Sequence, residues 1–132
     1  MSIDWLLTQL ADSFSGSLRV AEPMSKHTTW RIGGPADLLA IPANERDLLS
    51  LFSYCQEIGL PWQIIGHGSN LLVKDGGIRG VVIKIDRSLG KITWLPNGLY
   101  AQAGISFMAL AQKSVEQGFT GLEWACGIPG NL

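Results

Sequence analysis

The chain has few charged residues, and its basic residues are not clustered. Ten lysines and arginines stand against 11 aspartates and glutamates, which gives a net charge of −1 at pH 7. Proteins that bind nucleic acid or anionic membranes need a concentrated basic surface. We therefore expect neither of these partners.

Cysteines, histidines and long apolar runs are also scarce. Cys55 and Cys126 lie far apart without a CxxC pair, and His27 and His67 are the two histidines of the chain. Neither a zinc site nor a disulfide framework is predicted, and a reducing compartment fits best. Residues 1–14 lack a basic leader, and no apolar run is long enough to span a bilayer, so we expect a soluble, cytoplasmic protein.

The residues that are present favour a folded α+β domain. Hydrophobic residues make up 46% of the 132 positions, which is ordinary for a globular protein. Apolar spacing, helix caps and turn residues predict the elements in order: a helix from Ile3 that ends near Gly16, an extended segment from 17, a strand over 36–41, a helix from Asn44 to before Gly59, strands over 62–65 and 81–85, a hairpin over 91–103, and a helix after Ser106 that ends at Gly118.

The loop Gly66-His67-Gly68-Ser69-Asn70 is the strongest candidate for a ligand site. Its two glycines let successive backbone N–H groups face one concavity that holds a phosphate, and we expect a Cβ at Gly68 to crowd that phosphate. Ser69 and Asn70 add polar side chains. The segment lacks the parts of a Rossmann or P-loop motif, and taken alone it is equally typical of an ordinary turn.

Four blocks in a fixed order make the chain resemble a known family. They are His27–Asp37 (HTTWRIGGPAD), the loop Gly66–Val73, Gly104 with the helix after it, and Gly121-Leu122-Glu123 running into Gly127-Ile128-Pro129-Gly130. Together they resemble the UDP-N-acetylenolpyruvylglucosamine reductases, members of the vanillyl-alcohol-oxidase-like FAD-binding superfamily. The resemblance covers nearly the whole chain from Glu22 onward.

This resemblance implies a two-subdomain FAD-binding fold of the vanillyl-alcohol-oxidase/PCMH type. We expect a lead-in over residues 1–21, a first subdomain over 22–76, and the first, incomplete part of a second subdomain over 77–132. The expected cofactor-binding residues are Gly66, His67, Gly68, Ser69, Asn70, Leu71, Ile128 and Pro129, with weaker candidates at Arg31, Gly104 and Gly130.

The resemblance also implies a reaction in peptidoglycan precursor synthesis, and hence a link to cell-wall biogenesis, cell shape and cell division. NADPH would reduce FAD, which would pass hydride to UDP-N-acetylglucosamine enolpyruvate. The resemblance places the catalytic side chains beyond Leu132, so no catalytic residue is assigned here. We expect that the chain is truncated and that it lacks turnover by itself. Alternatives are a non-catalytic module without flavin, which could self-associate, and another FAD-dependent oxidoreductase of the superfamily.

Single polar residues have structural as well as functional interpretations. Arg31 is expected either to reach a cofactor phosphate or to pair with Asp37. His27 is expected to face solvent or cap a turn, and no metal site is predicted. His67 is expected to be a loop side chain beside the cofactor, and Glu123 to be structural.

Overall fold

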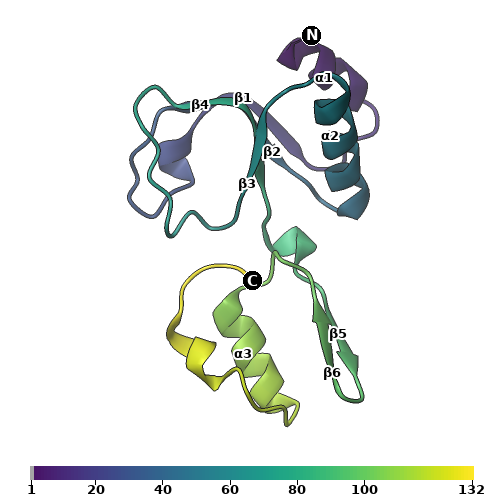
Figure 1. Cartoon of the computed structure of the whole chain (residues 1–132), viewed down its shortest axis with the longest axis vertical. Helices are drawn as coiled ribbons and strands as arrows, with labels where there is room; N and C mark the ends of the chain where they lie inside the picture. Colours follow the sequence, from purple (N-terminus) through teal and green to yellow (C-terminus); the bar gives the residue numbers. More distant parts are fainter. Residues whose placement is uncertain (1) are drawn as a thin grey trace.

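The computed structural model describes residues 2–132, which form two lobes (Figure 1). The first lobe contains a four-stranded sheet and two helices, and the second contains a two-stranded hairpin and one helix. The elements in chain order are α1 (Ile3–Leu10), β1 (Ser17–Pro23), β2 (Pro35–Ile41), α2 (Glu45–Glu57), β3 (Trp62–Ile65), β4 (Ile78–Lys84), β5 (Ile92–Leu95), β6 (Gly98–Ala101) and α3 (Phe107–Glu116).

The sheet of the first lobe has the strand order β1-β2-β4-β3. β1 is antiparallel to β2, whereas β2, β4 and β3 run parallel to one another. β4 therefore lies between two neighbours, and its residues Val81, Val82 and Ile83 are fully buried. A strand covered on both faces needs such a continuous apolar run, because neither face meets water.

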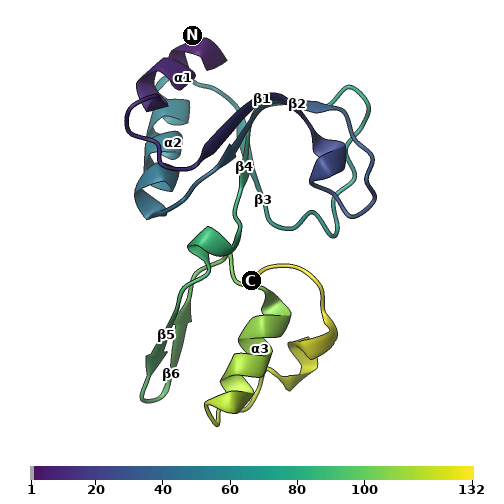
Figure 2. The same cartoon turned by 180° about the vertical axis from the view of Figure 1, so that it is seen from behind.

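The two faces of this sheet are covered differently (Figure 2). α1 and α2 cover one face, where Leu6, Leu10 and Leu51 pack against Val81 and Ile83 of the sheet. Loops and a short 3-10 turn (Met24–Lys26) cover the other face, where the buried cluster comprises Met24, Ala36, Leu39, Ile65, Val73 and Val82. The loop-covered face carries the polar sites described below.

The predicted start of α2 is confirmed. The side-chain oxygen of Asn44 accepts a hydrogen bond from the backbone N–H of Asp47 at 2.9 Å, as in a typical N-cap. Asp47 is itself buried, and its carboxylate accepts from the N–H groups of Ala43 and Ser15 at 2.9 and 3.1 Å. The Asp47 carboxylate thus connects the segment before β1 to the start of α2. Local sequence does not reveal this contact.

The second lobe also follows its local signals. β5 and β6 pair around Pro96-Asn97, which confirms the predicted hairpin. The hydroxyl of Ser106 accepts from the N–H of Ala109 at 3.4 Å and caps α3. Trp94 of the hairpin stacks on Phe119 beyond α3, with ring centroids 5.9 Å apart. This stack joins the hairpin to the end of the helix.

Two boundaries differ from those expected. The first helix ends at Leu10 rather than near Gly16. A division after Gly76 would place β4 in the second lobe, but β4 pairs with β2 and β3 in the first sheet. The chain passes between the lobes after Lys84. No helix in residues 2–132 is long and apolar enough to cross a membrane.

Candidate functional site

A cleft of about 420 Å³ lies where the two lobes meet. One wall is the loop that follows β3, and the other is the C-terminal segment. That segment is attached to the second lobe because Phe107 N–H donates to Gly130 O and Leu132 N–H donates to Ile105 O, both at 3.0 Å. The lining residues are Ile64, Ile65, Gly66, His67, Gly68, Ser69, Asn70, Leu71, Ile85, Ala103, Pro129, Gly130, Asn131 and Leu132.

The backbone amides of this loop are the main polar feature of the cleft. From His67 to Asn70, no N–H group donates a hydrogen bond to an acceptor within residues 2–132. The loop is nevertheless held in place, because Gly68 O accepts from the N–H of Thr29 at 3.1 Å. Consecutive N–H groups without partners form a concavity suited to an anion. The loop therefore offers a binding site for a phosphate.

Gly68 has a different role from the one expected. Its φ is +70°, a left-handed conformation that favours glycine, and a Cβ at this position would overlap the carbonyl oxygen of His27. The glycine allows the loop to approach the segment around His27. The expectation that a Cβ here would crowd the phosphate is wrong, because the Cβ would meet protein backbone first.

Two glycines on opposite walls determine the space in the cleft. A Cβ on Gly66 would lie 3.5 Å from the Asn131 side chain, and a Cβ on Gly130 would lie 3.3 Å from the Ser69 hydroxyl. The lining contains no lysine, arginine, aspartate or glutamate within the described chain, so amides, the Ser69 hydroxyl and the His67 ring provide its donors. FAD needs donors at its diphosphate and apolar surface beside its rings, and the residues present fit both needs.

Asn131 is a lining residue that the sequence did not identify. Its side-chain N–H donates to Ile85 O at 3.0 Å, which fixes the orientation of the amide because a carbonyl can only accept. The amide oxygen is buried and has no partner within residues 2–132, a state that costs about 1–3 kcal/mol. Local sequence gives no signal for this pairing, since the two residues are 46 positions apart.

Three expected cofactor residues lie outside the cleft lining. Ile128 follows the 3-10 turn Glu123–Gly127 and is 40% exposed. Gly104 is buried at a backbone crossing, where a Cβ would overlap the carbonyl oxygen of Asp86. Arg31 lines a neighbouring pocket instead. The other expected residues line the cleft, and their contact with a cofactor stays a prediction.

The neighbouring pocket has a volume of about 570 Å³ and contains most of the cationic side chains near the loop. His67 lines both this pocket and the cleft. The other lining residues are Ser25, Lys26, His27, Thr28, Thr29, Arg31 and Lys84.

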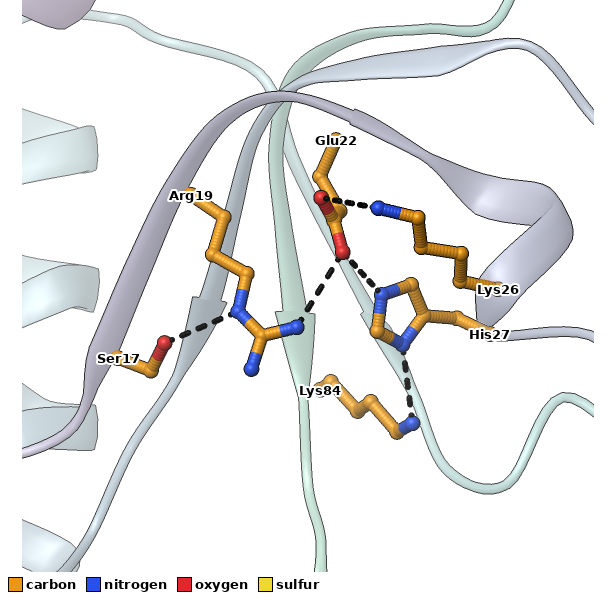
Figure 3. Close-up of polar contacts among 6 residues, drawn as sticks. All are labelled: Ser17, Arg19, Glu22, Lys26, His27 and Lys84. Carbon is orange, nitrogen blue, oxygen red and sulfur yellow. Dashed lines mark hydrogen bonds and ion pairs between the residues drawn. The ribbon is translucent and has the colours of Figure 1, made fainter.

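A buried network backs this pocket (Figure 3). His27 Nε2 lies 3.0 Å from a carboxylate oxygen of Glu22, and His27 Nδ1 lies 3.1 Å from the Lys84 ammonium. The hydrogen bond from His27 and the nearby cations Arg19 and Lys26 lower the pKa of Glu22, although burial opposes them. Burial lowers the pKa of Lys84. The expectation that His27 faces solvent is wrong, because its side chain is 7% exposed.

Arg31 does not pair with Asp37. The Asp37 carboxylate binds the Arg79 guanidinium at 2.6 Å and accepts from the Gly80 N–H at 2.9 Å. Arg31 is exposed, and no hydrogen bond or ion pair engages its side chain within residues 2–132. The pairing alternative is therefore wrong, and its guanidinium stays available to a ligand.

Two further candidates have structural explanations. Glu123 accepts a hydrogen bond from the Gly121 N–H at 2.7 Å, and backbone hydrogen bonds lower its pKa. Cys55 is 1% exposed in the helix-side core, and burial raises the pKa of its thiol, which makes it unreactive. In residues 2–132, no group of three or more His, Cys, Asp or Glu side chains is placed to hold a metal.

Comparison with known proteins agrees with the chemistry of the cleft. Residues 36–132 match the family model described as "FAD binding domain". The chain is 51% identical to UDP-N-acetylenolpyruvoylglucosamine reductase of Heliobacterium modesticaldum and 44% identical to that of Desulforamulus reducens, with 96% of this chain covered in each case. It spans 40% and 42% of the length of these curated relatives.

Solved structures show the same arrangement of elements. The crystal structure of UDP-N-acetylenolpyruvylglucosamine reductase from Thermus caldophilus matches with a TM-score of 0.65 and 28% identity, over 89% of this chain and 39% of that one. Cholesterol oxidase from Brevibacterium sterolicum matches with a TM-score of 0.58 and 17% identity, over 78% of this chain and 20% of that one. The second likeness concerns the fold alone, and with the first it supports the expected fold class.

Proposed function

The chain belongs to the FAD-binding domain family, and we propose on that premise that it holds FAD in the cleft at Gly66–Leu71. The observation that carries the proposal is the run of backbone N–H groups from His67 to Asn70, which have no acceptor within the described chain. A diphosphate supplies the acceptors that these groups lack.

Each wall of the cleft has a distinct task in this proposal. The amides and the Ser69 hydroxyl bind the diphosphate, while Ile64, Ile85 and Pro129 exclude water from the apolar parts of the cofactor. Bound FAD supplies the capacity to accept and pass on a hydride. In this proposal the protein groups that line the cleft bind and orient the cofactor.

The relatives support a proposal for the whole protein. We propose that this chain is part of an NADPH-dependent reductase that converts UDP-N-acetylglucosamine enolpyruvate to UDP-N-acetylmuramate, a cytoplasmic step of cell-wall synthesis on which cell shape and division depend. The sequence identities of 51% and 44% to two proteins named UDP-N-acetylenolpyruvoylglucosamine reductase support this activity. Because the chain spans about 40% of their length, we expect it to lack turnover by itself.

Flavin binding is tested with the purified 132-residue chain. Visible flavin absorbance shows whether the purified chain retains FAD. Quenching of tryptophan fluorescence as FAD is added gives the dissociation constant. Gly66→Ala places a methyl group in the cleft without a backbone clash, and we expect affinity to fall about tenfold, or about 1.4 kcal/mol. Gly76→Ala is the matched control, because a Cβ there meets nothing within 4 Å.

Two results would contradict the proposal. If the wild-type chain is colourless and shows no saturable response to FAD while its circular dichroism is that of a folded protein, the module does not hold flavin. Equal affinities for the Gly66→Ala and Gly76→Ala variants would place the cofactor elsewhere on the molecule.

A further inference from the structure

The pocket beside the cleft differs from it in charge. Lys26, Arg31 and Lys84 line this pocket, and its lining contains no acidic residue within the described chain. Ser25, Thr28 and Thr29 add hydroxyl groups. The cleft on the other side of the loop has no charged lysine, arginine or carboxylate. The positive charge near the loop is therefore concentrated on one side of it.

The hydrogen bonds behind the pocket keep the Lys84 ammonium directed into it. An ammonium group can only donate, so His27 Nδ1 must accept from Lys84 at 3.1 Å. The proton of the ring is then on Nε2, which donates to Glu22 at 3.0 Å. We assign this tautomer because it satisfies both contacts with a neutral ring. One histidine acceptor holds Lys84 and leaves its other N–H groups for a ligand.

Positive charge in this network exceeds negative charge. Glu22 is the carboxylate at its centre, and it is shared by Arg19 at 3.2 Å and Lys26 at 3.6 Å (Figure 3). Lys84 contributes a further cation through His27. Asp86 attracts Lys84 electrostatically, so two carboxylates stand against the three cations of the network, and Arg31 adds a fourth cation at the pocket.

Arg31 adds a second indication of a ligand. Its φ of +55° is a left-handed conformation that residues other than glycine seldom adopt. The strained backbone places an arginine at the pocket, yet no carboxylate of the described chain binds its guanidinium. Strain of this kind is concentrated at binding sites, where an added contact offsets it.

We propose that the pocket formed by Lys26, Arg31 and Lys84 binds a phosphate group of a nucleotide, separately from the apolar cleft. Three cations that line one pocket match a group with more than one negative oxygen, and the arginine can bind two of these oxygens at once. Partial burial of Lys84 strengthens the attraction, because charges interact more strongly away from bulk water. His67 separates the pocket from the cleft and lines both.

The phosphate could come from two sources. One source is FAD itself, in which case its diphosphate would lie past His67 in the pocket and not on the amides of the loop. The other is a second nucleotide, such as a phosphorylated nicotinamide dinucleotide. The shared chemistry is a phosphate ester, and the probe is therefore inorganic pyrophosphate.

Titration of pyrophosphate into the 132-residue chain tests the site, with affinity measured by calorimetry at fixed salt. Lys84→Met removes the charge but keeps the length of the side chain, and we expect at least about tenfold weaker binding. Lys113→Met is the matched control, since Lys113 is exposed on α3, and its affinity should stay within about twofold of wild type.

Arg31→Met tests the same site without disturbing the buried network. Arg31 is exposed, so this variant should fold normally, and we expect its affinity to fall about fivefold or more. The proposal is overturned if wild-type chain does not bind pyrophosphate, or if Lys84→Met and Arg31→Met bind it as tightly as Lys113→Met does.

Repeating the titration with FAD-saturated chain distinguishes the sources. Loss of the pyrophosphate binding that depends on Lys84 and Arg31 means that the cofactor's own diphosphate fills the pocket, and retention of that binding means that a separate nucleotide does. The first titration contains no flavin. The pyrophosphate affinity that it gives therefore tests the pocket even if the FAD proposal fails. Both outcomes support the phosphate site.

Discussion

The two lobes differ in how their structure is maintained. The first lobe buries apolar residues on both faces of a four-stranded sheet, among them Leu38, Val81 and Val82 at 0% exposure. The second lobe has a two-stranded hairpin and one helix, with a small buried set that includes Leu110 and Ala111. A two-stranded ribbon is marginally stable alone. The first lobe is thus a scaffold, and the second lobe is the less stable wall of the cleft.

A cavity in each lobe should produce the largest effects. We expect Leu38→Ala to lower the free energy of unfolding by about 3 kcal/mol, and Leu110→Ala by about 2 kcal/mol, because fewer layers surround α3. Urea unfolding measures the change in the free energy of unfolding for each variant. Hydrogen exchange should accelerate throughout the chain in the first variant and only in residues 92–132 in the second. Global acceleration by Leu110→Ala would contradict the comparison.

Removal of the buried carboxylate should have the next largest effect. Glu22→Gln breaks charge-assisted hydrogen bonds in the first lobe, and we expect a loss of about 2 kcal/mol at pH 7. Since folding lowers the pKa of Glu22 from its ordinary 4.5, its contribution is complete above that value and disappears as pH falls through the lower, folded pKa. Wild type and Glu22→Gln should therefore converge in stability in acid, and a constant difference down to pH 2 would refute this role.

The helix caps offer the smallest and best-matched comparison. Asn44→Ala removes a 2.9 Å cap bond in the first lobe and should cost about 1 kcal/mol. Ser106→Ala removes a 3.4 Å bond in the second lobe and should cost about 0.5 kcal/mol. Thermal unfolding measures both, and a larger loss for Ser106→Ala would show that the second lobe depends on its cap more than its geometry indicates.

Local elements could be predicted because adjacent residues determine them. Asn44 caps α2 with its own side chain, the strand Trp62–Ile65 has the bounds expected from its apolar run, and Asn97-Gly98 specifies the hairpin. The loop at Gly66–Leu71 was identified for the same reason, since its glycines and polar residues are consecutive. These predictions needed no knowledge of distant partners.

Features that depend on distant residues could not be predicted. The contact between Lys84 and His27 joins positions 57 apart, so the burial of His27 has no local signal. Asp37 was available to Arg31 in sequence, but the sheet brings Arg79 to it instead. Similarly, the hydrogen bond from Asn131 to Ile85 O forms at the cleft because the C-terminal segment returns to the junction of the lobes. Local sequence does not indicate this return.

The central claim is that the main-chain amides of the loop bind the diphosphate of FAD. Amide nuclear magnetic resonance of the chain, recorded with and without FAD, reports on those groups one by one. We predict that the signals of residues 67–70 shift and become protected from hydrogen exchange when FAD is added, while amides of the hairpin β5–β6 change little. Flavin binding that leaves the amides of 67–70 unchanged would contradict the claim.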